Sequence, residues 1–128
     1  YLIIGKSNDN SILNNLPSNI KYLGELNRNT VLNYIINSKG LINTSIEEGM
    51  SDTILSAMGL GCPVICNNNS GNSNIIDNLK TGYLFNEIND LENIFIKDHS
   101  KIILSAKNYI NNNHSILDEH QKYNKLFS

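Results

Sequence analysis

The residues best suited to chemistry in this chain are the neighbouring carboxylates Glu47 and Glu48, which precede the segment Gly49–Ser51. A short apolar run, Gly40–Ile42, comes before them, and a segment with helical spacing follows. Open parallel sheets bind their ligands outside the carboxyl ends of their strands, where such a loop lies. The start of the next helix attracts phosphate, because backbone amides are unpaired there. The pattern therefore favours sugar or phosphate chemistry at this loop.

The segment after the loop has the pattern of a helix followed by a buried strand. Its apolar residues recur at helical spacing and are Ile54, Ala57 and Met58. Ser51 or Asp52 can cap the helix by accepting a hydrogen bond from a backbone amide, and Gly61 suits the left-handed turn that ends it. Cys62–Cys66 then has the apolar pattern of a buried strand, with a proline near its start.

Elsewhere the sequence alternates strand patterns with helix patterns. The expected strands are Tyr1–Gly5, Ile20–Leu23, Gly40–Ile42, Cys62–Cys66 and Gly82–Phe85. The expected helices are Val31–Ser38 (capped by Asn29 or Thr30), Met50–Leu60, Ser73–Leu79, Asp90–Lys97, His99–Asn113 and a final helix capped by Ser115. The asparagine-rich stretch Asn67–Asn72 is expected to be a flexible loop. This alternation at short intervals predicts a doubly wound α/β fold with a parallel sheet.

The composition is that of one globular domain with a small-molecule ligand. The chain has 128 residues, of which 40% are hydrophobic and 17% charged, and its net charge is −2. This length suffices for one buried core. The charge balance favours neither a nucleic acid nor a membrane surface as partner. No apolar run approaches the roughly 20 residues that a membrane span needs.

The cysteines and histidines do not form a metal-binding pattern. Cys62 and Cys66 fall at the two ends of one strand pattern, and His99, His114 and His120 lie far downstream. A structural zinc site needs four ligands in close pairs. We therefore expect no metal, and we expect both thiols to be buried as small hydrophobic groups.

The first residues of the chain already have the pattern of an apolar strand, Tyr1–Gly5, and no charged-then-apolar leader precedes it. We therefore expect the chain to be a piece of a longer protein. For that protein the expected location is cytoplasmic.

Five segments occur in an order that resembles a known family. They are IKYLG (Ile20–Gly24), EEGMS (Glu47–Ser51), ILSAMGLGCPVI (Ile54–Ile65), SGNSNII (Ser70–Ile76) and TGYLF (Thr81–Phe85). Together they resemble the C-terminal, nucleotide-sugar-binding half of the retaining GT-B glycosyltransferases of family 4, also called glycosyltransferase group 1. The Glu-Gly-Met-Ser run, and a Gly-Asn pair where most members have Gly-Gly, resemble a eukaryotic subgroup of that family.

The resemblance implies that residues 1–128 form a partial nucleotide-sugar-binding domain with a Rossmann-like fold, in which residues 99–128 are C-terminal helices. The parent enzyme would transfer a sugar from a nucleoside diphosphate sugar to an unknown acceptor. The donor is a substrate, and the resemblance implies neither a cofactor nor a metal.

The resemblance also implies roles for the residues of the acidic loop. Glu48 matches the first glutamate of the family's Glu-x7-Glu motif, whose carboxylate accepts hydrogen bonds from the transferred sugar, and it is therefore the catalytic candidate. The backbone amides of Gly49, Met50 and Ser51 would lie near the sugar and the diphosphate, in keeping with the anion preference of a helix start.

Two further segments match ligand-binding positions of the family. Tyr22, Leu23 and Gly24 match the place where the base of the nucleotide rests against the backbone. Gly71 matches a glycine in the loop after the fourth expected strand, which passes near the cleft.

The sequence departs from the family at the second glutamate of the motif. That glutamate would fall eight residues after Glu48, where this chain has Ser56. In the family it resembles a clamp on the ribose, and hydrogen bonds to charged groups are roughly twice as strong as neutral ones. We therefore expect donor binding to be weaker by about 1–3 kcal/mol.

A second departure concerns what precedes the resemblance. The family's first strand and helix of this half, which bring a basic pair toward the diphosphate, have no counterpart in the sequence, and neither does the acceptor-binding N-terminal half. Without these cations the charge that develops on the leaving nucleoside diphosphate is poorly stabilised. We therefore expect the chain alone to be inactive in transfer.

Other interpretations remain open. Glu48 could be a solvated loop carboxylate or could complete a capping box with Ser45. The chain could be a non-catalytic descendant in which Ser56 marks a lapsed site, leaving a scaffold or regulatory module. A dehydrogenase half is disfavoured, because no Gly-x-Gly-x-x-Gly run follows a strand.

Overall fold

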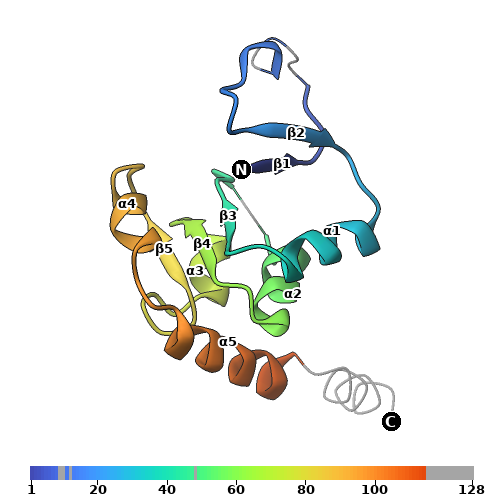
Figure 1. The fold of residues 1–128 in the computed structure, drawn as a ribbon. Coiled ribbons are helices and arrows are strands. Elements are labelled where there is room, and N and C mark those ends of the chain that lie inside the picture. The colour runs from blue at the N-terminus through green and yellow to red at the C-terminus, as the bar shows by residue number, and fades with distance from the viewer. Residues whose placement is uncertain (9–10, 12, 48, 115–128) are drawn as a thin grey trace. The chain divides into compact units, whose positions relative to one another are not determined.

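The computed structural model describes residues 1–8, 11, 13–47 and 49–114, and the chain divides into two compact units at residues 34 and 35 (Figure 1). Two predictions fall outside the described residues. They are the catalytic candidate Glu48 and the final helix capped by Ser115.

The first unit contains a two-stranded parallel sheet. It pairs β1 (Leu2–Ile4) with β2 (Lys21–Gly24), and a short 3-10 helix, η1 (Leu13–Asn15), lies in the connection. The Tyr22 hydroxyl donates a hydrogen bond of 2.8 Å to the carbonyl oxygen of Gly5. The amide of Gly5 donates in turn to the carbonyl of Gly24 over 2.9 Å, so the two strand ends are fastened together.

Helix α1 (Arg28–Ile36) begins three residues before the predicted start at Val31. The predicted caps, Asn29 and Thr30, are wrong. Asn27 caps the helix instead, because its Oδ1 accepts hydrogen bonds of 3.0 Å from both the amide and the hydroxyl of Thr30. An asparagine oxygen at this position satisfies an amide that has no partner inside the helix.

The second unit is built on a three-stranded parallel sheet in the order β3-β4-β5. These strands are β3 (Leu41–Asn43), β4 (Val64–Asn67) and β5 (Tyr83–Phe85). Leu41 pairs with Val64, and Ile65 pairs with Tyr83. Parallel neighbours need a crossover between them, and α2 (Asp52–Leu60) and α3 (Ser70–Ile75) provide it. The predicted α/β class with parallel strands and helical crossovers is confirmed.

Helix α2 ends as predicted but starts at Asp52, two residues after the predicted Met50, and among the described residues the predicted capping hydrogen bond of Ser51 or Asp52 is absent. Ser51 is its N-cap residue, and Gly61 ends it in the left-handed region with φ of 81°. Its predicted apolar stripe is fully buried at Ile54, Ala57 and Met58. The helix packs against β3, β4 and α5.

One part of the core of this unit lies between the sheet and the last two described helices. These are α4 (Asp90–Phe95), which packs on β5, and α5 (Ser100–Asn113), which runs beside α2 (Figure 1). The buried cluster comprises Ile65, Tyr83, Phe85 and Ile94. Successive side chains of a strand point to opposite faces. Val64, Ile65 and Cys66 are all buried, so both faces of β4 are covered.

Both cysteines are free and buried, as predicted. Burial raises the pKa of the Cys62 thiol, against an opposing hydrogen bond with Ser38, whose Oγ lies 3.3 Å from the sulfur. The thiol is therefore protonated at neutral pH, and a protonated thiol is a poor nucleophile.

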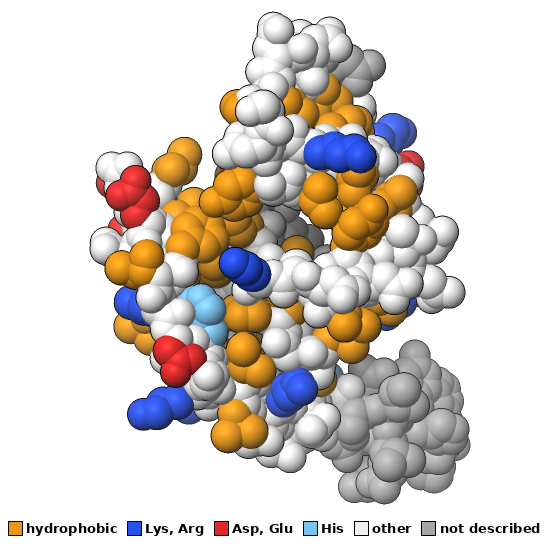
Figure 2. Space-filling view, in the orientation of Figure 1, with side chains coloured by type: hydrophobic (Ala, Val, Ile, Leu, Met, Phe, Trp, Pro, Cys, Tyr) orange, Lys and Arg blue, Asp and Glu red, His pale blue; other side chains and the backbone are white. Residues whose placement is uncertain are grey.

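On the face drawn in Figure 2, the described Lys and Arg side chains are scattered, some of them beside Asp or Glu, and do not gather into one patch. None of the helices in the described part of the chain combines the length and apolarity needed to cross a membrane.

Candidate functional site

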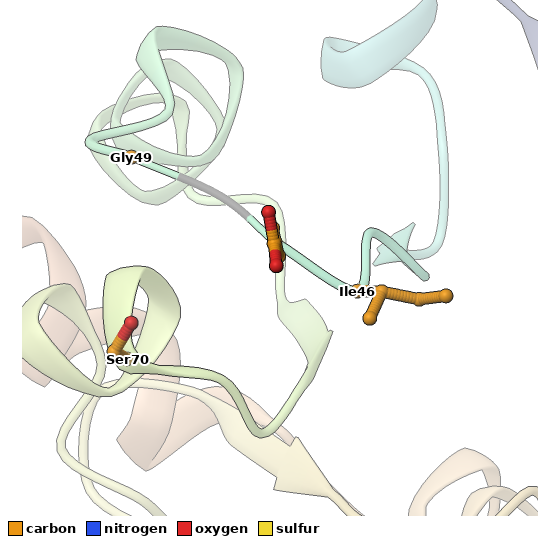
Figure 3. A pocket seen from close by; sticks show the side chains of 4 residues that line it. Ile46, Gly49 and Ser70 are labelled. Carbon is orange, nitrogen blue, oxygen red and sulfur yellow. The ribbon is translucent and has the colours of Figure 1, made fainter.

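A pocket of about 460 Å³ opens beside the loop that follows β3. It is lined by Ile46, Glu47 and Gly49 from that loop and by Ser70 at the start of α3 (Figure 3). The loop leaves the carboxyl end of β3, and α3 follows the carboxyl end of the neighbouring strand β4. The pocket therefore lies at the edge of the sheet where open parallel sheets bind ligands.

The two walls of the pocket come from different crossovers. In Figure 3, Ser70 faces the segment that carries Ile46 and Gly49 across an open space, and the side chain of Ile46 points away from Ser70. Ile46 is 83% exposed, and Glu47 and Ser70 are exposed as well. The carboxylate of Glu47 and the hydroxyl of Ser70 are therefore accessible to a ligand from solvent.

A closed ring of hydrogen bonds joins residues that lie close to the lining residues in the chain. The side-chain amides of Asn67 and Asn69 both donate to the carbonyl oxygen of Ser45, over 3.2 and 2.9 Å. The Asn69 Oδ1 accepts from the Asn72 backbone amide over 2.8 Å. The Asn72 side-chain amide donates to the Asn67 carbonyl over 2.9 Å and closes the ring. The ring fastens the loop after β3 to the start of α3.

The expectation of a flexible loop over Asn67–Asn72 is therefore wrong. Asn67 is the last residue of β4, and Asn69 is the N-cap of α3, which starts at Ser70 and not at the predicted Ser73. Asparagine side chains can both accept from and donate to nearby backbone groups. In this stretch they use that capacity to order the chain.

The predicted residues of the acidic loop occupy different places. Gly49 lines the pocket. Met50 is 67% exposed and is absent from the described lining. Ser51 has the extended backbone of an N-cap residue, but its side chain makes no capping hydrogen bond. Gly71 is buried in the first turn of α3, next to the lining residue Ser70.

Ser56 and Tyr22–Gly24 are not among the lining residues that the structure describes. Ser56 lies in the middle of α2 and is partly buried. Tyr22, Leu23 and Gly24 form most of β2 in the first unit and are also partly buried. Glu48 lies outside the described residues.

The chemistry offered by the described lining suits a ligand with many hydroxyl groups. Glu47 supplies a carboxylate that accepts hydrogen bonds, and Ser70 supplies a hydroxyl that both donates and accepts. No cation is among the described lining residues. The nine-residue helix α2 begins just after Gly49, and the start of a helix favours an anion.

Two lining residues were not singled out from the sequence. Ile46 belongs to no quoted segment and Ser70 only opens the segment SGNSNII, and Ser70 becomes part of the site because α3 starts there. The signal that could have found Ser70 is Asn69, since asparagine is a favoured N-cap residue. Among the residues that the structure describes, no three His, Cys, Asp or Glu side chains come together as metal ligands could.

The model of the family described as "Glycosyl transferases group 1" matches residues 2–97. Glycosyltransferase 1 domain-containing protein 1 of Xenopus tropicalis is 39% identical over 95 residues, which cover 70% of this chain. The matched segment is 28% of the length of that relative.

Solved structures share the fold at lower sequence identity. The structure of HepE from Anabaena, in complex with UDP-glucose, has a TM-score of 0.84 at 18% identity and covers 98% of this chain and 40% of HepE. The C-terminal domain of the group 1 glycosyl transferase LpcC from Francisella tularensis has a TM-score of 0.64 at 23% identity, with 76% of this chain and 54% of that domain covered.

Proposed function

The chain belongs to the glycosyl transferases group 1 family, and we propose that it forms the donor-binding part of an enzyme that transfers a sugar from a nucleoside diphosphate sugar to an acceptor. The observation that carries the proposal is the pocket at the carboxyl ends of β3 and β4, with Gly49 and Ser70 on opposite walls. HepE, which shares the fold, holds UDP-glucose. UDP-glucose is therefore the first donor to test.

In this proposal the start of α2 faces the charged part of the donor. The amides of Gly49, Met50 and Ser51 precede or open a helix of nine residues, and Ser51 does not use its side chain to cap it. Amides without an internal partner are available to phosphate oxygens, and the helix dipole favours the negative charge. Gly71, buried beside Ser70, would line the same approach.

The sugar would be held by carboxylates of the loop after β3. Glu48 is the proposed catalytic residue on the strength of its motif, and Glu47 is already at the pocket. A carboxylate that accepts hydrogen bonds from two sugar hydroxyls fixes the orientation of the ring and of the bond to be broken. Tyr22–Gly24 would support the base through backbone contacts. Transfer would retain the configuration of the sugar and would need no metal.

The rest of the catalytic apparatus would come from a longer protein. The chain spans only 28% of the curated relative and 40% of HepE. In the proposal, the parent protein supplies the acceptor site and the cations that stabilise the leaving diphosphate. Residues 1–128 alone would bind a donor without transferring its sugar.

A specific observation also favours a second candidate, a lapsed donor site that serves as a scaffold or regulatory module. Ser56 stands where the family motif has its ribose glutamate, and its hydroxyl is neutral and short. It can engage one ribose hydroxyl, whereas a carboxylate can accept from two.

An amide NMR titration of this chain with UDP-, GDP- and ADP-glucose would separate the two candidates. Donor binding predicts saturable shifts at Gly49–Ser51, at Ser70 and Gly71, and at Tyr22–Gly24. The base that saturates at the lowest concentration would identify the donor nucleotide. The first donor-free spectrum serves as the control for folding.

A folded chain whose amides do not respond to any of the three donors would contradict the donor proposal for this chain. The same titration on a longer chain, which includes the preceding segment of the parent protein, would then decide whether the site has lapsed or is incomplete in residues 1–128.

A further inference from the structure

We propose that Asn69 is a positioning residue of this pocket, whose single carboxamide holds the two walls at a fixed separation and thereby sets the affinity for the donor. The proposal rests on the proposed donor site and assigns a role to a residue outside the Glu-x7-Glu motif.

The geometry places Asn69 between the walls. Its Nδ2 donates over 2.9 Å to the carbonyl oxygen of Ser45, the residue before the lining residue Ile46. Its Oδ1 accepts over 2.8 Å from the amide of Asn72 in the first turn of α3. Ser70, the lining residue of the opposite wall, follows Asn69 directly in the chain. One side chain therefore contacts both crossovers.

Asn72 makes this link rigid. It is fully buried, and its side-chain amide donates to the carbonyl oxygen of Asn67, whose own side-chain amide donates to the carbonyl oxygen of Ser45. Among the described residues, the Asn72 Oδ1 has no hydrogen-bond partner. Turning the carboxamide over would point that oxygen at the Asn67 carbonyl, and two acceptors repel each other. The orientation of Asn72, and with it the ring, is thus fixed by the backbone.

Asparagine performs both parts of the task at position 69, and neither aspartate nor serine does. Aspartate would still accept from the Asn72 amide, but it would turn a carboxylate oxygen toward the Ser45 carbonyl, which is also an acceptor. Serine would also cap α3, but its side chain is too short to span both contacts. These two substitutions keep the cap and remove the link, one with added charge and one without.

The neighbouring Asn68 offers a matched control. It is exposed, and its side-chain amide donates over 3.0 Å to Oδ1 of Asn86. It contacts neither Ser45 nor the described lining of the pocket through this bond. Asn68→Ser and Asn68→Asp therefore make the same chemical changes one residue away. If a substitution has the same effect on exchange or affinity at both positions, the effect comes from the changed side-chain type or charge. It does not come from loss of the Asn69–Ser45 hydrogen bond.

The experiment measures three quantities on all four variants and on the parent chain. They are hydrogen exchange of the Ser45 amide in the loop after β3, which donates over 2.9 Å to Oδ1 of Asn43, exchange of α5, and the dissociation constant for UDP-glucose. We expect Asn69→Ser and Asn69→Asp to speed exchange of the loop about 10-fold and to leave α5 unchanged. We expect UDP-glucose to bind about 3- to 10-fold more weakly to Asn69→Ser, as for the loss of one hydrogen bond.

The inference is overturned if Asn69→Ser matches Asn68→Ser in both loop exchange and affinity. It is also overturned if exchange rises equally in the loop and in α5, because Asn69 would then support the whole fold and not the pocket. If the parent chain binds no UDP-glucose, the proposed donor fails, and loop exchange alone decides whether Asn69 positions the walls.

Discussion

The hydroxyl oxygen of Tyr83 lies 2.9 Å from Nδ1 of His99, and the two rings meet edge to face with their centroids 5.4 Å apart. This contact ties β5 to the residue that precedes α5. Tyr83 is only 2% exposed. Burial, and to a smaller extent the charge of Asp98, raise the pKa of the Tyr83 hydroxyl above its ordinary value of 10.0.

The raised pKa predicts a loss of stability in alkali. Tyr83 gives up its proton more readily in the unfolded chain, so its contribution to the free energy of unfolding is complete below about pH 10 and is lost as the pH rises through the folded pKa. Urea unfolding between about pH 8 and 11 should show a steeper decline for the parent chain than for Tyr83→Phe. Tyr34→Phe, at an exposed site, should behave like the parent. Parallel declines for all three chains would contradict the prediction.

Gly82 is predicted to be intolerant of any side chain. A Cβ atom there would lie 2.7 Å from Cγ2 of Val64, 3.0 Å from Cγ2 of Ile76 and 3.2 Å from the carbonyl oxygen of Val64. Two of these atoms belong to stiff, buried, β-branched side chains and the third to the backbone of β4. We expect Gly82→Ala to lower the free energy of unfolding by about 1–3 kcal/mol, measured by urea denaturation.

Gly59 in α2 is the matched control for that substitution. Apart from the helix's own backbone, a Cβ there would have one described neighbour within 4 Å, Cγ2 of Ile110 at 3.4 Å. Alanine favours a helix interior over glycine by about 0.5–1 kcal/mol, so Gly59→Ala should be neutral or stabilising. Equal destabilisation by the two variants would show that the contacts of Gly82 are not the cause.

Ser56→Glu is predicted to strengthen donor binding. The substitution restores the carboxylate of the family motif, and a charge-assisted pair of hydrogen bonds to the ribose is worth about 1–3 kcal/mol. Isothermal titration with UDP-glucose should show a lower dissociation constant for Ser56→Glu than for Ser56→Gln, which has the same length without the charge. If the glutamate variant binds no better than the parent chain, Ser56 does not occupy the ribose position.

The two neighbouring glutamates should differ in their effect on binding. If Glu48 contacts the donor sugar, Glu48→Ala should weaken UDP-glucose binding by about 1.5–3 kcal/mol, as for a hydrogen bond to a charged group. Glu47→Ala should have a smaller effect, because Glu47 is exposed at the pocket wall. NMR shifts that survive Glu48→Ala unchanged would show that Glu48 does not contact the donor sugar.

The buried stripe and the end of helix α2 were predicted best, because their residue types have strong local conformational or burial preferences. The stripe of Ile54, Ala57 and Met58 has helical spacing and is buried as a unit. Gly61 ends α2 in a left-handed conformation that other residues rarely adopt. Both signals are local, so neither depends on which segments meet later in the fold.

The prediction failed where asparagine side chains cap a helix or bond to a distant segment. Asn27 and Asn69 start helices earlier than the hydrophobic spacing indicates, because a cap is independent of the apolar stripe. Asn67 and Asn69 both reach Ser45, more than twenty residues earlier in the chain. Such contacts depend on the pairing of β3 with β4, which residue spacing alone does not specify.

The candidate site shows the same division. The loop containing Gly49 followed from the strand, turn and helix pattern, and it does line a pocket. The opposite wall at Ser70 depends on where α3 starts, and the start depends on the cap by Asn69. The strand, turn and helix pattern thus indicated one wall, and the cap by Asn69, which hydrophobic spacing does not reveal, sets the start of the other.

The labelling rates of the two buried thiols can report how often the core opens. Cys66 is 0% exposed and Cys62 is 5% exposed, and they lie at opposite ends of the segment that enters and forms β4. A thiol-specific reagent can modify them only when the surrounding structure opens, so the labelling rate measures how often α2 and its neighbours part from the sheet. Because Cys62 is adjacent to the α2 C-cap, the ratio of the two rates distinguishes fraying of that helix end from opening of the whole core.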